Sequence, residues 1–245
     1  MKISEIYEIL NSISAFESQE NWDNSGLLLG DFSQEVERIY LSLDVSEDQI
    51  ENAEKNSLFI THHPLIFKGL KDLANENYPR NLIKKMLAKN IALISMHTNY
   101  DKSHLNAYFT REILGFNEFL QDDFLIYVNF NENYEKLIER VKKSLNLKHL
   151  CTSFIKNLHA KVGEIAICTG SGSELVSALK KGVKCFLTGD LKYHTAFEAM
   201  NNNLALMDIG HFESERYFGE SLAKHLQNLQ IKVIILPCKN PFEIF

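Results

Sequence analysis

Short apolar runs that alternate with helix-patterned segments constrain the fold of this chain most. In the N-terminal half, strand-like runs at 38–45, 58–61 and 91–96 are separated by helix-compatible stretches at 47–56 and 80–89. Parallel strands need a long crossover connection, which is usually a helix. We therefore predict a βαβα series with a largely parallel sheet and right-handed crossovers.

Two further helices are predicted around this series. Four apolar side chains recur at helical spacing near the N-terminus and predict an opening amphipathic helix: Ile3, Ile6, Leu10 and Ile13. Residues 105–114 form the other predicted helix, and Gly115 is its expected C-cap.

A second alternating series occupies the C-terminal half. Strands are predicted at 124–130, 164–168, 183–188, 204–209 and 232–236, and helices at 134–145, 174–181, 193–201 and 213–229. The periodicity breaks between residues 115 and 124. We therefore expect two similar α/β lobes, 1–120 and 121–245, with largely parallel sheets flanked by helices. The last strand can also return to pack on the first lobe.

Composition and charge exclude several classes of protein. The formal net charge is −6, and no basic stripe interrupts it, which argues against a nucleic-acid binder, including a ring that encircles DNA. No stretch approaches 18 consecutive apolar residues, and the N-terminus lacks the features of a signal peptide. Four widely spaced cysteines without a Cys-x-x-Cys pair indicate the reducing cytoplasm rather than a thiolate zinc site.

Three of the apolar runs end on histidine. The run at 58–61 is followed by His62 and His63, and His97 and His211 close two other runs. In open α/β sheets, ligands bind outside the carboxyl ends of the strands. Adjacent residues of a strand point to opposite faces, so His62 and His63 are expected to serve two ions or to flank one. Since Pro64 keeps His63 extended, either arrangement is open.

Two carboxylates accompany these histidines. Asp101 follows His97 by four residues, and Glu215 follows His211 by four. This spacing brings both side chains of a pair to one helix face, where they can reach a common ion. A single histidine at a strand end is more often a hydrogen-bonded loop residue, but three such sites together favour a metal centre.

The donor set consists of nitrogen and oxygen. It suits Zn²⁺, Mn²⁺, Fe²⁺, Co²⁺ or Ni²⁺. Five or more ligands exceed the number that one catalytic zinc uses with an open position, so we expect two divalent ions per chain. Such pairs activate water and stabilise attacking and leaving oxygens.

Two loops each admit two interpretations. Residues 169–173, Thr-Gly-Ser-Gly-Ser, lie between a strand and a helix and can hold phosphate or form an ordinary turn. Residues 22–26, Trp-Asp-Asn-Ser-Gly, contain the only tryptophan, and this polar loop either contacts a substrate or forms a packed corner.

Several longer motifs resemble the NGG-interacting-factor-like family, whose bacterial members are often called GTP cyclohydrolase 1 type 2 homologs. They are Trp22-Asp-Asn-Ser-Gly-Leu-Leu-Leu-Gly30, Leu43-Asp-Val45, Thr61-His-His-Pro-Leu-Ile-Phe67, His97-Thr-Asn-Tyr-Asp101, Gly170-Ser-Gly172, Thr188-Gly-Asp190, Lys192-Tyr-His194 and Gly210-His211 with Glu215. The resemblance covers nearly the whole chain. Where the family usually has a glycine pair after the aspartate, this chain has Lys102-Ser-His104, and it lacks the long middle insertion of larger relatives.

The resemblance implies two similar lobes with a dinuclear metal site between them and a homohexameric ring built as a trimer of dimers. Carried over residue by residue, it implies the metal ligands His62, His63, Asp101, His211 and Glu215. Asp101 and Glu215 are expected to bridge, because a carboxylate has two oxygens to share. His97 matches a family histidine and is expected at the site as an extra ligand or a proton shuttle.

The resemblance also implies an activity, which is hydrolysis of GTP to 7,8-dihydroneopterin triphosphate by metal-activated water. His97 and His194 are the expected acid/base residues. Gly170, Gly172 and Lys192 are the expected contacts to the triphosphate. The alternative is a non-catalytic, ring-shaped metal-binding protein that acts as a metal carrier, sensor or partner scaffold, and it uses the same ligands.

Overall fold

The computed structural model describes residues 1–243, which form two compact units with one sheet each. The first unit comprises Met1–Ser103 and the segment from Phe218 onward, and the second comprises His104–Tyr217. These bounds differ from the division at residue 120 expected from the sequence. The residues before Gly115 are helical and belong with the second unit, whereas the C-terminal segment adds a strand to the first sheet.

The first sheet has the order β1-β4-β3-β2-β11. Its strands are β1 (Gly26–Leu29), β2 (Arg38–Ser42), β3 (Leu58–Thr61), β4 (Ala92–Ser95) and β11 (Lys232–Ile235). β4, β3, β2 and β11 are parallel, as predicted, and β1 joins β4 in an antiparallel pairing with a register shift. In this sheet the carboxyl ends of β3 and β4 lie side by side, with Thr61 opposite Ser95.

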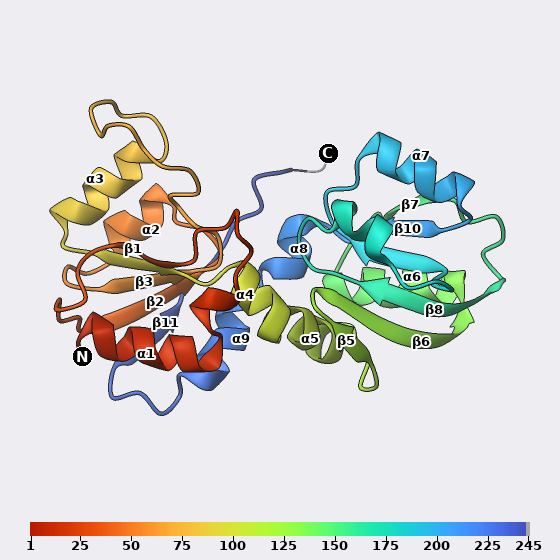
Figure 1. The fold of residues 1–245 in the computed structure, drawn as a ribbon, viewed down its shortest axis with the longest axis horizontal. Helices are drawn as coiled ribbons and strands as arrows, with labels where there is room; N and C mark the ends of the chain where they lie inside the picture. The colour runs from red at the N-terminus through yellow and green to blue at the C-terminus, as the bar shows by residue number, and fades with distance from the viewer. Residues whose placement is uncertain (244–245) are drawn as a thin grey trace. The chain divides into compact units, whose positions relative to one another are not determined.

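Helices cover both faces of this sheet. They are α1 (Ile3–Ile13), α2 (Glu47–Asn52), α3 (Arg80–Ala88) and α9 (Phe218–His225). α2 and α3 lie on one face, and α1 and α9 lie on the other (Figure 1). Because strand side chains alternate, Phe59 and Leu93 pack with Ile50 and Met86 on the α2–α3 face. A 3₁₀ turn (Phe16–Ser18) follows α1, and α4 (Thr98–Tyr100) follows β4.

The second sheet has the order β5-β6-β8-β9-β10-β7. Its strands are β5 (Leu120–Asp122), β6 (Leu125–Asn133), β7 (Cys151–Ser153), β8 (Lys161–Ile167), β9 (Cys185–Thr188) and β10 (Ala205–Asp208). Only β8, β9 and β10 are parallel. The prediction of a largely parallel sheet is therefore wrong for this unit. The short strand β7 went unpredicted, and it pairs with β10 at one edge while β8 returns beside β6 in the antiparallel sense.

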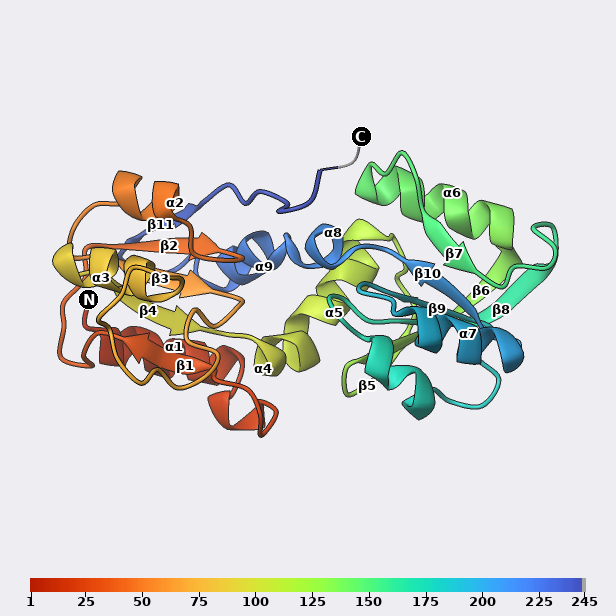
Figure 2. The ribbon, with the colours of Figure 1, turned by 90° about the horizontal axis from the view of Figure 1, so that it is seen from above.

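The helices of the second unit pack on both faces of its sheet. They are α5 (Asn106–Tyr108), α6 (Tyr134–Leu145), α7 (Tyr193–Asn201) and α8 (His211–Glu215). α6 and α7 lie on opposite sides of this sheet (Figure 2). Ile126 and Ile165 pack in the core on the α6 side, and Tyr127 and Phe186 pack with Ala199 of α7.

Two local predictions differ from the structure. The predicted helix 174–181 is a 3₁₀ helix at Ser173–Ala178, and the predicted helix 213–229 is divided into α8 and α9. π-helical turns occupy Asp101–Leu105 and Phe109–Ile113, so the family's glycine position at 102–104 is helical here and not a tight turn. No helix among residues 1–243 is long and apolar enough to cross a membrane.

Candidate metal centre

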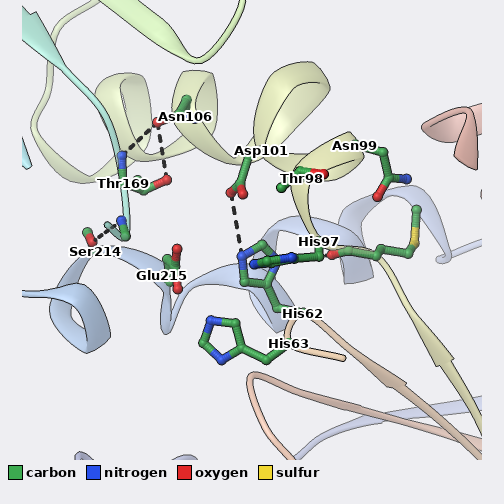
Figure 3. A network of polar contacts seen from close by, with 12 residues as sticks. His62, His63, His97, Thr98, Asn99, Asp101, Asn106, Thr169, Ser214 and Glu215 are labelled. Atoms are coloured by element: carbon green, nitrogen blue, oxygen red, sulfur yellow. Dashed lines mark hydrogen bonds and ion pairs between the residues drawn. The ribbon is translucent and has the colours of Figure 1, made fainter. Parts of the chain in front are cut away.

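Three histidines gather at the carboxyl ends of β3 and β4 in the first unit. Thr61 ends β3, so His62 and His63 lie beyond the pleated strand and do not have to point apart. The ring centroids of these two histidines are 5.1 Å apart, and His97 lies 5.1 Å from His62 and 5.6 Å from His63 (Figure 3). One ring nitrogen from each of the three lies within 4.8 Å of the others. The sequence prediction that these strand ends converge is confirmed within this unit.

Each of these imidazoles has Nδ1 hydrogen-bonded to an oxygen. Nδ1 of His62 lies 2.9 Å from the carbonyl oxygen of Met96, and Nδ1 of His63 lies 2.8 Å from Oδ1 of Asp44. Nδ1 of His97 lies 2.8 Å from Oδ1 of Asp23. Carbonyl and carboxylate oxygens only accept, so Nδ1 is the donor in each of these three hydrogen bonds. Metal-binding histidines show this arrangement, in which the second nitrogen fixes the tautomer.

Asp23 is the most strongly held of these acceptors. Its side chain is fully buried, and besides His97 it accepts hydrogen bonds from the backbone N–H (3.0 Å) and hydroxyl (2.5 Å) of Thr98. Burial alone would raise the pKa of the Asp23 carboxyl. The hydrogen bond and charge of His97, with the bonds from Thr98 and the Asn24 N–H, instead hold that pKa well below its usual range. Asp23 is therefore ionised at neutral pH and fixes the orientation of the His97 ring.

Asp101 adds a carboxylate to this set. It follows α4, the short helix that begins after His97, and is 7% exposed. Its Oδ1 lies 3.5 Å from Nε2 of the fully buried His62 (Figure 3). The helix places Asp101 beside the histidine at the end of the neighbouring strand. The four-residue spacing predicted a pair of Asp101 with His97, and the contact found is with His62 instead. The first unit therefore presents three imidazoles and one carboxylate.

The second unit carries its own donor pair on α8. Nε2 of His211 lies 2.8 Å from Oε2 of Glu215, one helical turn away. Nδ1 of His211 lies 2.7 Å from Oδ2 of Asp190, which follows β9. Nδ1 of His211 is thus held by a carboxylate, as in His63 and His97, while its Nε2 contacts Glu215, which is 3% exposed. A buried carboxylate and a tautomer-fixed imidazole at this separation can share one cation.

Two glycines make room for this pair. Gly170 has a φ of +65°, and a Cβ there would lie 1.8 Å from Oε1 of Glu215. A Cβ on Gly189 would lie 2.6 Å from the backbone nitrogen of His211 and 2.7 Å from the carbonyl oxygen of Gly170. Packing therefore requires glycine at 170, in the 169–173 loop, and at 189, directly after β9, because both positions lie against the donor residues.

The same loop directs its backbone N–H groups into the protein. Thr169 donates to Oδ1 of Asn106 (2.7 Å), Gly170 donates to the hydroxyl of Ser214 (2.9 Å), and Gly172 donates to the hydroxyl of Thr188 (2.8 Å); the first two are drawn in Figure 3. In this conformation these N–H groups are hydrogen-bonded to residues of the second unit. The assignment of Gly170 and Gly172 to a triphosphate stays a prediction, and the proposal below does not depend on it.

Two other predicted residues lie on or just before α7. His194 is exposed in the first turn, with its ring 5.3 Å from that of Tyr193. Lys192 is exposed, with Nζ 3.5 Å from Oε1 of Glu174. Their assigned roles, proton transfer for His194 and triphosphate binding for Lys192, stay predictions.

Sequence reasoning placed Asp190 at a strand end but did not pair any histidine with the acid that holds it. Asp23, Asp44 and Asp190 are 74, 19 and 21 residues away from their partners along the chain. A signal was present for two of them, because Asp44 and Asp190 each follow the end of a parallel strand by two residues. Asp23 precedes β1, a strand that the sequence reading did not predict.

The fold and these donors define an α/β protein with groups of histidine and carboxylate side chains that could hold a metal ion. A sequence profile of the Duf34/NIF3 (NGG1p interacting factor 3) family matches residues 1–241. The chain belongs to this family, and the resemblance noted from its motifs is confirmed.

Named relatives agree with this assignment. A Campylobacter jejuni protein named "GTP cyclohydrolase 1 type 2 homolog" is 58% identical over 245 residues and covers all of both chains. A Helicobacter pylori protein named "GTP cyclohydrolase 1 type 2" is 41% identical over 243 residues, which is 99% of this chain and 98% of the relative.

Solved structures show the same fold. A hypothetical protein of Staphylococcus aureus has a TM-score of 0.87 at 24% identity and covers 100% of this chain and 99% of its own. Reduced HcgD from Methanocaldococcus jannaschii has a TM-score of 0.83 at 25% identity, with 96% and 98% coverage.

Proposed function

We propose that this protein is a hydrolase that depends on two divalent ions and converts GTP and water to 7,8-dihydroneopterin triphosphate and formate. The observation that carries the metal dependence is the cluster of His62, His63 and His97, whose ring nitrogens lie within 4.8 Å of one another, with Nδ1 of each ring held by an oxygen. The choice of GTP rests on the names of the relatives, two of which are given above.

In this proposal both donor sets serve one dinuclear centre. His62, His63 and His211 would supply the nitrogen ligands, and Asp101 and Glu215 would supply the carboxylates. Support comes from each set taken by itself: the first has three imidazoles and one acid, and the second has one of each. Neither set alone supplies the ligands that two ions require. When bound, such ions lower the pKa of water and stabilise negative charge that develops in hydrolysis.

The residues of the chain supply the remaining functions. His97 has its Nδ1–H held by Asp23, so Nε2 is the atom at which this ring gives or takes a proton. The ionised Asp23 stabilises the charged form of the ring, as an orienting acid does beside a catalytic histidine. The family's hexameric ring and a cytoplasmic location belong to this proposal as predictions.

The test is turnover of GTP by protein reconstituted with each candidate metal. Formate release and a fluorescent pterin after oxidation are the readouts, with metal content measured in the same samples. We expect two ions per chain and turnover in the wild type. His63→Ala and Glu215→Ala should each lose metal and lower turnover by at least about 1000-fold, a loss of about 4 kcal/mol of transition-state stabilisation.

Matched controls are His159→Ala and Glu118→Ala, since both side chains are exposed and lie outside the donor sets. Both should retain wild-type metal content and activity. Absence of turnover in protein that holds two ions per chain would exclude GTP as the substrate. The non-catalytic metal-binding protein would then be the better interpretation.

A further inference from the structure

Two exposed aromatic side chains flank His97 in the first unit. Trp22 is 59% exposed and Phe67 is 44% exposed. The ring centroid of His97 lies 6.2 Å from Trp22 and 6.4 Å from Phe67, and both contacts are edge-to-face. The packed-corner interpretation of the 22–26 loop does not fit an indole with more than half of its surface open. Leaving this apolar area in water is unfavourable unless something covers it.

Hydrogen bonds hold the segments that carry Trp22 and Phe67 in place. The Asn24 amide donates to the carbonyl oxygen of Ile66 (2.5 Å) and thereby ties the tryptophan loop to the residue before Phe67. The hydroxyl of Ser25 accepts from the His97 N–H (3.1 Å), while Asp23 holds the imidazole of the same residue. The loop that orients His97 therefore also presents Trp22.

The geometry of the aromatic pair leaves ring faces open. The ring centroids of Trp22 and Phe67 are 5.9 Å apart and their planes are inclined by 53°, so the two rings do not stack face to face. Indole and phenyl faces bind a planar base by stacking, and they do so without reading its hydrogen-bonding edges. The pair is therefore suited to a flat heteroaromatic ring.

We propose that Trp22 and Phe67 form a platform on which the heteroaromatic ring of the substrate stacks beside His97. This inference rests on the proposed function, because it assigns the residues that bind the ring whose bond is broken. Trp22 and Phe67 determine that the substrate is planar and aromatic, and they position it without entering the chemistry.

The first experiment measures ring binding without turnover. Trp22 is the only tryptophan of the chain, so emission excited near 295 nm reports on this loop alone. Metal-loaded protein is titrated with GTP, with guanosine and with inorganic tripolyphosphate. We expect saturable quenching by GTP and guanosine and none by tripolyphosphate. Equal quenching by tripolyphosphate, or none by guanosine at millimolar concentration, would overturn the platform.

The second experiment uses variants. Phe67→Ala keeps the fluorophore and should weaken guanosine binding by roughly 5- to 150-fold, the range for loss of one stacked aromatic. In turnover assays Trp22→Ala should raise KM by a similar factor with a smaller change in kcat, and Trp22→Phe should restore KM. Phe242→Ala is the matched control, since this aromatic is 79% exposed beyond β11.

The two proposals fail differently. Quenching by guanosine without turnover of GTP would leave the platform standing and remove the proposed reaction. Turnover of GTP with an unchanged KM in Trp22→Ala and Phe67→Ala would leave the reaction standing and remove the platform.

Discussion

The two units provide metal donors by different means. In the first unit, the donors follow parallel strands, and long-range hydrogen bonds that the imidazoles donate to oxygens of Met96, Asp44 and Asp23 orient the rings. In the second unit, the donors occupy the single helix α8, and the neighbouring backbone makes space for them through glycines at 170 and 189. The first donor set is positioned chiefly by the hydrogen bonds of its rings. In the second, Asp190 likewise holds His211, but the set also requires the space that the two glycines leave beside it.

This difference predicts where each set is vulnerable. The first should fail when an orienting acid is changed, because the rings would lose their tautomer and direction. The second should fail when a methyl group is added nearby, because close-packed backbone cannot move aside. Three variants test this contrast.

Gly189→Ala should have the largest effect. Its new Cβ would meet backbone atoms of His211 and Gly170 at 2.6 and 2.7 Å, and neither can rotate away. We expect a loss of about 3 kcal/mol in unfolding free energy from overpacking, measured by urea denaturation of metal-free protein. Gly69→Ala is the control, since a Cβ there has no neighbour within 4 Å and should leave stability nearly unchanged. Equal stability of both variants would contradict the packing role of Gly189.

Asp23→Asn should have an intermediate effect. The amide keeps the size of the side chain but removes the charge that holds the Nδ1–H of His97. Because His97 is the proposed acid/base residue, we expect turnover to fall about 100-fold. Metal affinity is measured in the same variant by competition with a chelator, and a fall of about 10- to 100-fold there would make His97 a metal ligand as well. Asp31→Asn, at an exposed turn acid of the same unit, should bind metal like the wild type.

The outcome also assigns the role of His97. Unchanged metal affinity with slower turnover would remove His97 from the ligands and leave it as a proton shuttle. If metal affinity and turnover were both unchanged, the orientation of His97 by Asp23 would not matter for function.

Asn133→Ala should have the smallest effect of the three. Its side chain accepts the N–H of Lys136 (3.0 Å) and caps α6 in the second unit. Loss of a cap costs about 1 kcal/mol, and thermal unfolding should register it with no change in metal content. Ser46→Ala, the equivalent cap of α2 in the first unit, is the matched variant. A change in metal content in Asn133→Ala would show that α6 influences the metal donors, and this would contradict the comparison of the two units.

Local structure was predictable where sequence signals agree. α6 spans Tyr134–Leu145 as expected, because Asn133 is a favourable N-cap and apolar side chains recur at helical spacing. β3 spans Leu58–Thr61 as expected, since a short apolar run ends at His62-His63-Pro64. In contrast, β1, β5 and β7 have three or four residues each and carry too little pattern to be recognised.

The sequence by itself determined the types of donor and their grouping at strand ends, because a strand's polarity and a four-residue helical spacing are local properties. It also determined the family, through motifs spread over the chain. Only the tertiary structure decided the antiparallel pairings of the second sheet, the oxygen that holds each Nδ1, and the packing of glycines against Glu215 and His211. Those features depend on which distant segments meet, and a hydrogen bond between residues 74 apart leaves no periodic trace in the chain.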